Sequence, residues 1–318
     1  MAEPAQVNLE ENEPHCAVLD DAAIAVLRAQ HAEAGRTVDA PVTLQGEKGE
    51  FSFLQLGLQS RDSDSGRFRL TLWHKPAIRA VKKLQNIGVT HIVTLHSSEG
   101  GEGKYVSELQ HKVEECNADS VLKWIYIPLT GANLDTLRAE KTLMMVTEGI
   151  QNVEKAVMEW YDQNASEKAK RRRKTEQKEA VGCDGVRAAR VGSQAGEAQS
   201  SSDDFGGLGQ AISYYASGVA ELCDIVSEGL PDNGTDSQAG VTSHESATQP
   251  SILVHCSAGM HRTGFFAYGL MRALSGLRPQ EARECLYLMR RDTGEKVGHD
   301  RIRIAEEQLV PHLLKIGF

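Results

Sequence analysis

Long apolar runs and a secretory leader pattern are both missing from this sequence. No apolar segment approaches the roughly 18 residues that a membrane-spanning helix needs. Residues 1–14 are polar and acidic, without the basic and apolar regions of a secretory signal. We therefore expect an intracellular chain with no membrane partner.

Paired cysteine motifs are absent as well. The six cysteines are scattered, and no two of them are separated by only two residues. In an intracellular chain this spacing argues against disulfides and against a zinc site, so we expect no metal ion. Cys223 and Cys285 stand among apolar residues at helical spacing, which indicates small buried side chains. The six are Cys16, Cys116, Cys183, Cys223, Cys256 and Cys285.

An excess of positive charge is also lacking. The chain has 35 Lys and Arg against 44 Asp and Glu, for a net charge of -9. A chain this acidic is a poor general binder of nucleic acid or of membrane surfaces. We expect a cytoplasmic protein, in which the basic run Lys170–Lys174 is either a solvated charge run or a nuclear import signal.

The sequence does contain an alternation of strand-like and helix-like segments. Residues 51–56 and 67–72 alternate like strands, the β-branched run 89–95 indicates a buried strand, and residues 123–129 indicate another strand. Pro76 is well placed in the first turn of an intervening helix. This order predicts the α/β class, as a single domain whose central, mostly parallel sheet is flanked by helices.

Two low-complexity segments interrupt this pattern. Residues 164–206 and 231–249 hold too little apolar surface to offset the entropy of ordering, so we expect both to be disordered. Residues 208–230 between them have apolar residues at helical spacing. Since neither flank is complete without the other, the chain divides into an N-terminal extension, 1–48, and one domain, 49–318, that holds both insertions.

One Gly- and Ser-rich segment, residues 97–104, invites comparison with a nucleotide-binding loop. That motif needs Gly, four residues, and then Gly-Lys-Ser/Thr, but Ser98 holds the first position here and Tyr105 the last. The pattern therefore predicts a plain loop. A long helical stretch, residues 137–161, follows later in the chain.

The strongest signal follows a short apolar strand, residues 251–254. A polar loop leads from this strand directly into an apolar helix that begins near Phe265. Such a loop directs several backbone N–H groups at one spot, and the helix dipole adds to them, so the segment predicts an anion site. The loop reads His255-Cys256-Ser257-Ala258-Gly259-Met260-His261-Arg262-Thr263-Gly264.

The residue types in this loop suit phosphate chemistry. The field that binds an anion also stabilises a thiolate, so Cys256 is predicted to be the nucleophile. Arg262 offers a planar fork to two phosphate oxygens. Thr263 is in place to hydrogen-bond the sulfur, and His255 to order the loop through hydrogen bonds to backbone. The other predicted substrate-binding residues are Ser257, Ala258, Gly259, Met260 and His261, of which Gly259 permits close approach of the backbone.

His-Cys, five residues, then Arg-Thr resembles the signature loop of the protein tyrosine phosphatase superfamily. The resemblance covers residues 51–318 less the insertions, and it is to the small dual-specificity type, because we see no counterpart of the phosphotyrosine-recognition loop of the larger domains. It implies the cysteine-phosphatase fold and hydrolysis through a thiol-phosphate intermediate, with no metal or cofactor. The implied partner is a phosphorylated protein carrying phosphotyrosine, with phosphoserine and phosphothreonine as further substrates.

The sequence departs from the family at the general acid. The family usually places an Asp in the loop before the long helix, but Gly131 or Ala132 occupies that place here. Asp135 is the first acidic residue beyond it. Asp135 is therefore either the general acid or the cap of a helix that starts near Thr136.

Two further positions leave alternatives open. His261 either lines the rim of the pocket or faces solvent. Residues 290–301 resemble a polar loop that small members of the superfamily place near the active site, where Arg301 either contacts substrate or pairs with Asp300. The phosphoinositide phosphatases of the superfamily often carry Lys inside the signature loop, whereas Met260 and His261 stand here.

Two other functions fit the same loop. One is removal of phosphate from RNA 5′ ends, which normally needs a basic approach surface, and this makes nucleic acid a disfavoured partner. The other is a phospho-binding module with little turnover, which would keep Cys256 and Arg262 but lack a general acid. Activity on an aryl phosphate and on a phosphotyrosine peptide would separate these possibilities.

Overall fold

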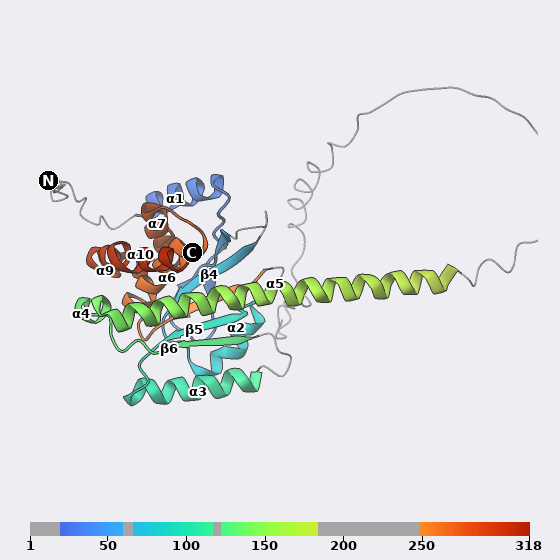
Figure 1. Ribbon diagram of the computed structural model, residues 1–318, viewed down its shortest axis with the longest axis horizontal. Coiled ribbons are helices and arrows are strands. Elements are labelled where there is room, and N and C mark those ends of the chain that lie inside the picture. The colour runs from blue at the N-terminus through green and yellow to red at the C-terminus, as the bar shows by residue number, and fades with distance from the viewer. Residues whose placement is uncertain (1–19, 60–65, 117–121, 184–248) are drawn as a thin grey trace, which may run out of the picture. The chain divides into compact units, whose positions relative to one another are not determined.

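The computed structural model describes residues 20–59, 66–116, 122–183 and 249–318 (Figure 1). Residues 1–170 and 245–318 form one unit and residues 171–244 another. The fold described below is that of the first unit. The predicted helix at 208–230 lies outside the described residues, as does the insertion at 231–249 except for Gln249.

A mixed sheet of five strands forms the centre of this unit, with the order β3-β4-β7-β5-β6. β3 is antiparallel to β4, and the pairs β4–β7, β7–β5 and β5–β6 are parallel. The predicted α/β class with a mostly parallel sheet is therefore confirmed. The strands are β3 (Leu54–Gly57), β4 (Arg67–Trp73), β5 (His91–Leu95), β6 (Lys123–Ile127) and β7 (Ser251–His255).

The inner strands are buried on both faces because their apolar runs are continuous. Every residue of β5 and β7 is buried. Successive side chains point to opposite faces, so Ile252 and Val254 join one hydrophobic cluster whereas Leu253 joins the other. The two clusters lie on the two faces of the sheet.

Different helices cover these two faces (Figure 1). One face packs against α5, α6 and α7, and against the helices that end the chain. The other packs against α2, α3 and a small antiparallel hairpin, β1–β2. The bounds are β1 (Val42–Thr43), β2 (Glu50–Phe51), η1 (Ile78–Ala80), α2 (Val81–Asn86), α3 (Gly100–Cys116), α4 (Leu134–Arg138), α5 (Glu140–Cys183), α6 (His261–Leu274) and α7 (Pro279–Met289).

Four short helical elements after α7 complete the unit. They bury Ile302, Ile304, Leu309 and Leu313 against the cluster that α6 also joins. No helix beyond α7 was predicted from the sequence. The elements are α8 (Arg291–Lys296), α9 (His299–Ile304), η4 (Ala305–Leu309) and α10 (Val310–Lys315).

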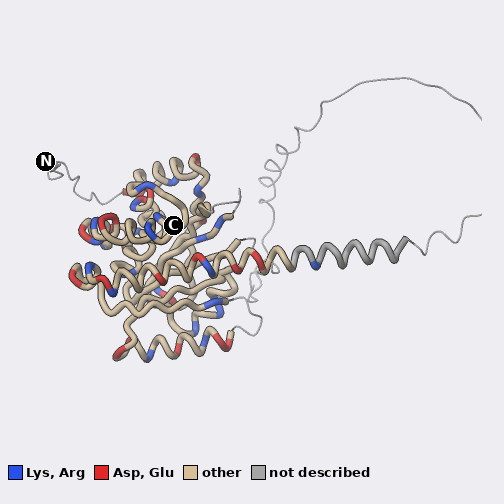
Figure 2. Tube along the Cα trace, in the orientation of Figure 1, with Lys and Arg blue, Asp and Glu red and all other residues tan. Residues whose placement is uncertain are grey.

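Three differences from the sequence predictions concern helices and strands outside the centre of the sheet. The predicted loop at 97–104 gives way to α3 from Gly100 onward, and α3 carries acidic and basic residues in turn along its length (Figure 2). The strand predicted at 51–56 is divided between β2 and β3. Helix α5 continues to Cys183 through much of the first predicted insertion, because Ala, Glu, Lys, Arg and Gln are good helix formers even where no core is available.

The described part of the N-terminal extension packs on the domain. The N-cap of α1 (Asp21–Glu33) is Asp20, whose carboxylate accepts from the N–H of Ala23. His31 at its other end is buried, with Nε2 3.1 Å from Glu284 of α7. No helix among the described residues is long and apolar enough to cross a bilayer.

Three histidines of the central sheet region are held uncharged by burial. Desolvation lowers the pKa of His91 to about 4 and that of His96 to about 4. It also lowers the pKa of His255 well below the usual 6.5. The unfolded chain takes up these protons near pH 6.5 and the folded chain does not, so acid selectively stabilises the unfolded state.

We expect the free energy of unfolding to be greatest above pH 6.5 and to fall as the pH drops from 6.5 toward 4. Below pH 6 the three histidines together give a slope of about 4 kcal/mol per pH unit, since each proton contributes about 1.4 kcal/mol. Urea unfolding at pH 7.5, 6.0 and 5.0 measures this slope. His91→Gln should reduce the slope by about one third, and a free energy independent of pH over this range would contradict the expectation.

Candidate active site

The predicted anion loop lies between β7 and α6, as the sequence indicated. Cys256 follows the last residue of β7 and is 3 % exposed, and α6 begins at His261. The N–H of Gly259 donates to Cys256 Sγ at 3.2 Å. A backbone donor directed at the sulfur, at the N-terminus of a buried helix, stabilises a negatively charged thiolate.

Gly259 is required by its conformation and by its surroundings. Its φ of +68° lies in the left-handed region that side chains disfavour. A Cβ at this position would collide with the guanidinium of Arg290 and with the carbonyl oxygen of Trp73. The loop can therefore turn tightly around the sulfur only with glycine here.

Two side chains from the α7–α8 junction hold the outer side of the loop. Arg290 Nη1 donates to the carbonyls of Ala258 at 2.9 Å and of Gly259 at 2.8 Å. Thr293 Oγ1 donates to the same Gly259 carbonyl at 2.6 Å. With these carbonyls held outward, the loop is kept in the conformation that leaves its N–H groups available to an anion. The sequence predicted a polar loop here near the active site, but not this role of Arg290 and Thr293.

Arg262 is fixed by a carboxylate that sequence analysis missed. Its Nη1 and Nη2 donate to the two oxygens of Glu102 at 2.9 and 2.7 Å, and Nη1 also donates to the carbonyl of Leu129 at 2.7 Å. Burial acts to lower the pKa of Arg262, but the hydrogen bond to Glu102 and the charge of Cys256 outweigh it and raise the pKa. Glu102 thus holds the guanidinium beside the sulfur.

Glu102 reaches this place because α3 begins at Gly100, inside the segment that was predicted to be a loop. It lies in the first turn of α3, and its Oε2 accepts from the N–H of Ser97 at 2.7 Å. The hydrogen bond from Arg262 lowers the pKa of Glu102 to about 2, so this carboxylate is ionised at neutral pH and is a poor proton donor. The sequence signal for this partner of Arg262 was an acidic residue soon after the predicted strand 89–95. That signal becomes meaningful only when β5 is known to lie beside β7, which leads into the loop that carries Arg262.

The buried imidazole rings of His255 and His96 lie at the sheet end of the phosphate loop. His255 Nε2 lies 2.9 Å from Thr94 Oγ1, which also accepts from Trp124 Nε1 at 2.9 Å. The His255 ring lies 5.3 Å from that of His96, whose Nδ1 is 3.6 Å from Glu102 Oε1. The expected bond from His255 to loop backbone is not what the structure shows; its partner is the Thr94 side chain on the neighbouring strand.

The other loop residues are placed as follows. Ser257 Oγ contacts Glu102 and lies 3.1 Å from Arg262 Nη2. The Thr263 hydroxyl is buried and has no hydrogen-bond partner among the described residues, so the hydrogen bond predicted from Thr263 to the Cys256 sulfur is not formed. The donor to the sulfur is the Gly259 N–H. His261 is largely exposed at the start of α6, and burial with the nearby charge of Arg301 lowers its pKa, which leaves it uncharged at neutral pH.

The loop before α5 contains the candidate general acid. Asn133, not Asp135, caps the helix here: its Oδ1 accepts from the N–H of Thr136 at 2.7 Å, and α4 begins at Leu134. The alternative in which Asp135 is the cap is therefore wrong. Asp135 lies exposed in the first turn of α4.

Arg301 holds this loop in place. Its Nε donates to the carbonyl of Ala132 at 2.8 Å and its Nη1 to that of Val297 at 3.1 Å. Asp300, the expected partner of Arg301, pairs with Arg303 instead at 2.9 Å. Leu129 in the same loop accepts from Arg262, so Arg262 connects this loop to the anion site.

Glu102→Gln is expected to lower kcat about tenfold while KM changes little. The amide keeps the shape but loses the charge that fixes Arg262, and about 1.4 kcal/mol of charge-assisted hydrogen bonding is a tenfold change in rate. Steady-state kinetics on p-nitrophenyl phosphate measure both constants. Glu99→Gln, at an exposed position just before α3, is the matched control, and equal rates in the two variants would remove Glu102 from the site.

Metal-binding clusters of side chains are the next feature of the site. Across residues 20–59, 66–116, 122–183 and 249–318 there is no cluster of three or more His, Cys, Asp or Glu side chains with metal-binding geometry.

Comparison with known families agrees with this arrangement. A family model described as the tyrosine phosphatase family matches residues 68–282, which is more than half of the chain. A search of curated proteins and a search of solved structures each found no match. The matched segment contains the whole loop from His255 to Thr263, the strand before it and the helix after it. The chain belongs to the tyrosine phosphatase family.

Proposed function

We propose that the protein is a dual-specificity protein phosphatase, which removes phosphate from tyrosine and also from serine and threonine side chains of proteins. The observation that carries this proposal is the single arrangement of Cys256 Sγ, the Gly259 N–H and the guanidinium of Arg262 at the start of α6. It places a nucleophile, a backbone donor and a planar cation together at one position, where a phosphate group would bind.

The first half of the proposed reaction forms a covalent intermediate. The Cys256 thiolate attacks phosphorus, an S–P bond forms, and the bond from phosphorus to the substrate oxygen breaks. Arg262 and the loop N–H groups stabilise the charge on the transferred phosphoryl oxygens. The leaving oxygen takes a proton, for which we propose Asp135 as the donor, because the ionised Glu102 cannot supply one.

The second half releases phosphate. Water attacks phosphorus, the S–P bond breaks, and inorganic phosphate leaves as the Cys256 thiolate is restored. The Asp135 carboxylate formed in the first half accepts the proton of the attacking water, so protons balance over the cycle. No step needs a metal or a redox cofactor.

The test compares substrates that share everything but the phosphorylated group. Three peptides of one sequence, carrying phosphotyrosine, phosphoserine or phosphothreonine, are assayed beside p-nitrophenyl phosphate and a 5′-triphosphorylated RNA, with Cys256→Ser as the blank. Turnover of all three peptides supports the proposal. Turnover of phosphotyrosine alone would make the enzyme tyrosine-specific, preference for the RNA would favour the RNA 5′-phosphatase, and tight binding without turnover would favour a binding module.

A further inference from the structure

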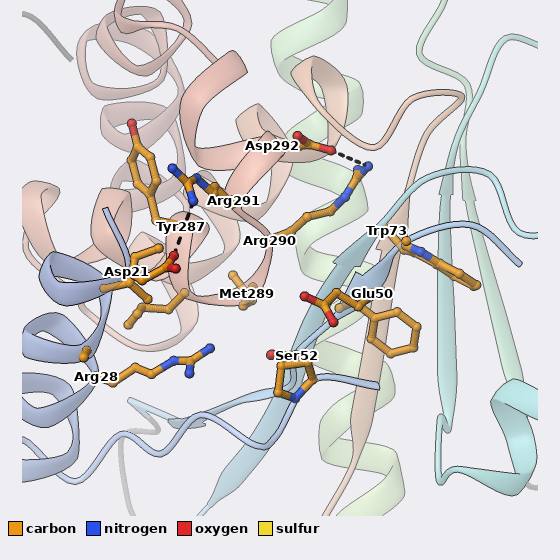
Figure 3. A pocket seen from close by; sticks show the side chains of 16 residues that line it. Asp21, Arg28, Glu50, Ser52, Trp73, Tyr287, Met289, Arg290, Arg291 and Asp292 are labelled. Atoms are coloured by element: carbon orange, nitrogen blue, oxygen red, sulfur yellow. Dashed lines mark hydrogen bonds and ion pairs between the residues drawn. The ribbon is translucent and has the colours of Figure 1, made fainter. Parts of the chain in front are cut away.

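A second concave site lies beside the phosphate loop. It is a cleft of about 680 Å³ between α1, the β1–β2 hairpin and the α7–α8 junction (Figure 3). Apart from Arg290, which holds the phosphate loop from outside, none of the residues that line the cleft takes part in the proposed reaction. The cleft is large enough for several residues of a polypeptide or for a small organic molecule.

The cleft adjoins the phosphate loop, because Trp73 and Arg290 line the cleft and also lie against Gly259 of the loop. Trp73 ends β4 and lines the cleft, and it pairs with His255 across the parallel β4–β7 ladder. Cys256 comes next in the chain after His255. Arg290 belongs to both sites, since it lines the cleft while its Nη1 donates to the carbonyls of Ala258 and Gly259.

The floor of the cleft is apolar. Phe51 and Met289 are each 1 % exposed and line it, and Ile24 of α1 adds a third apolar side chain. The hairpin is fixed to the end of α7, because the N–H of Ser52 donates to the carbonyl of Met289 at 3.1 Å. The floor is therefore a preformed surface that an apolar side chain can cover without a large rearrangement.

The walls of the cleft carry opposite charges. The side chains of Arg28 on α1 and Glu50 on β2 reach toward the interior from opposite sides (Figure 3), and neither side chain has a hydrogen bond or ion pair with any described residue. The other charges are already engaged: Arg291 lies 3.5 Å from Asp21, and Arg290 lies 3.4 Å from Asp292. Arg28 is thus the cation available to an incoming acid, and Glu50 repels a run of acids.

From this geometry we propose that the cleft binds the part of a substrate polypeptide next to its phosphorylated residue. One acidic side chain pairs with Arg28, and a neighbouring apolar side chain covers the floor of Phe51 and Met289. The inference rests on the proposed function in that the occupant is a phosphorylated polypeptide. It adds to that function a preference for sequence around the phosphorylated position.

The test uses phosphotyrosine peptides with an alanine background in which one Asp or one Lys is moved along the sequence. At one distance from the phosphotyrosine, Asp should lower KM about twofold to fivefold relative to Lys, as expected for a partly exposed ion pair. Arg28→Glu should reverse this preference. Lys315→Glu, an exposed charge reversal on α10, should leave the preference as in the wild type.

A second variant tests the cleft by filling it. Ala25→Trp places a large ring in the cleft from an exposed position on α1, whereas Val26→Trp, at a neighbouring exposed residue that does not line the cleft, is the matched control. Ala25→Trp should raise KM for the long peptides about fivefold or more, and Val26→Trp should not. Both variants should retain the wild-type kcat/KM on p-nitrophenyl phosphate, which is too small to reach the cleft.

Binding measured without turnover separates this inference from the proposed function. In the Cys256→Ser background, fluorescence anisotropy with labelled phosphopeptides should show the same dependence on Ala25→Trp and Arg28→Glu. If that dependence appears while the wild-type protein turns over no peptide, the cleft is a substrate-type site and the proposed activity is wrong. If peptide KM and affinity are unchanged in both variants, the cleft does not bind substrate and the inference is overturned.

Discussion

Cys256→Ser is expected to abolish turnover of every phosphate ester while phosphate analogues still bind. A serine hydroxyl stays protonated at neutral pH and is a far weaker nucleophile than a thiolate, so the rate should fall by at least about 10⁴-fold. The Gly259 N–H, the other loop donors and Arg262 all remain in place. Steady-state turnover of p-nitrophenyl phosphate measures the loss of activity. The affinity for tungstate, a phosphate analogue, measures whether the loop still binds an anion.

Alkylation is a second test of whether Cys256 is the reactive nucleophile. Iodoacetamide at neutral pH should modify Cys256 first and abolish activity in step with modification, and inorganic phosphate should protect the enzyme. Cys116→Ser, at a partly exposed cysteine at the end of α3, is the matched control and should retain full activity. Hydrolysis that survives in Cys256→Ser would rule out the thiol-phosphate intermediate.

The centre of the fold could be predicted because local sequence determines it. The apolar runs of β5 and β7 are buried on both faces, and no other local structure suits such short β-branched segments. The loop from His255 to Thr263 was recognisable for a similar reason, since nucleophile, glycine and arginine are only a few residues apart. A site made by one continuous segment can be found without knowing the rest of the fold.

The partners of that loop were missed because they depend on strand order. Glu102 becomes the partner of Arg262 only because β5 lies beside β7, and Trp73 meets Gly259 only because β4 lies on the other side. Strand order is decided by packing over the whole sheet, and no spacing in the sequence expresses it. The same reason applies to Arg290, which contacts the loop from the end of α7.

The extent of α5 shows a different limit of sequence reasoning. Low apolar content in residues 164–206 predicted disorder, yet the helix continues to Cys183. A polar segment cannot build a core, but it can extend a helix whose first turns are already packed, because adding a residue to an existing helix avoids the cost of nucleation. Val146, Ile150, Val153 and Val157 supply that packed beginning.

Asp135→Asn is expected to lower the rate on a phosphotyrosine or alkyl phosphate peptide by about 10²–10⁴-fold, and on p-nitrophenyl phosphate by much less. A tyrosine or serine oxygen must be protonated as it leaves, whereas nitrophenolate leaves readily without a proton. The basic limb of the pH–rate profile should flatten, because it reports the proton on the acid. The acidic limb should remain, because it reports formation of the thiolate and ionisation of the substrate.

Two controls separate a proton donor from a residue that only shapes its loop. Asn133→Ala removes the true cap of α4 and should cost about 1 kcal/mol of stability with equal, small losses of rate on both substrates. Glu140→Gln removes the next exposed carboxylate, in the first turn of α5, and should change neither substrate's rate. If Asp135→Asn resembles Asn133→Ala, with equal losses and an unchanged basic limb, Asp135 is not the acid. Since Glu102 is ionised by Arg262 and cannot replace it, the site would then lack a proton donor for peptide substrates, and a phospho-binding role would explain Cys256 and Arg262 better.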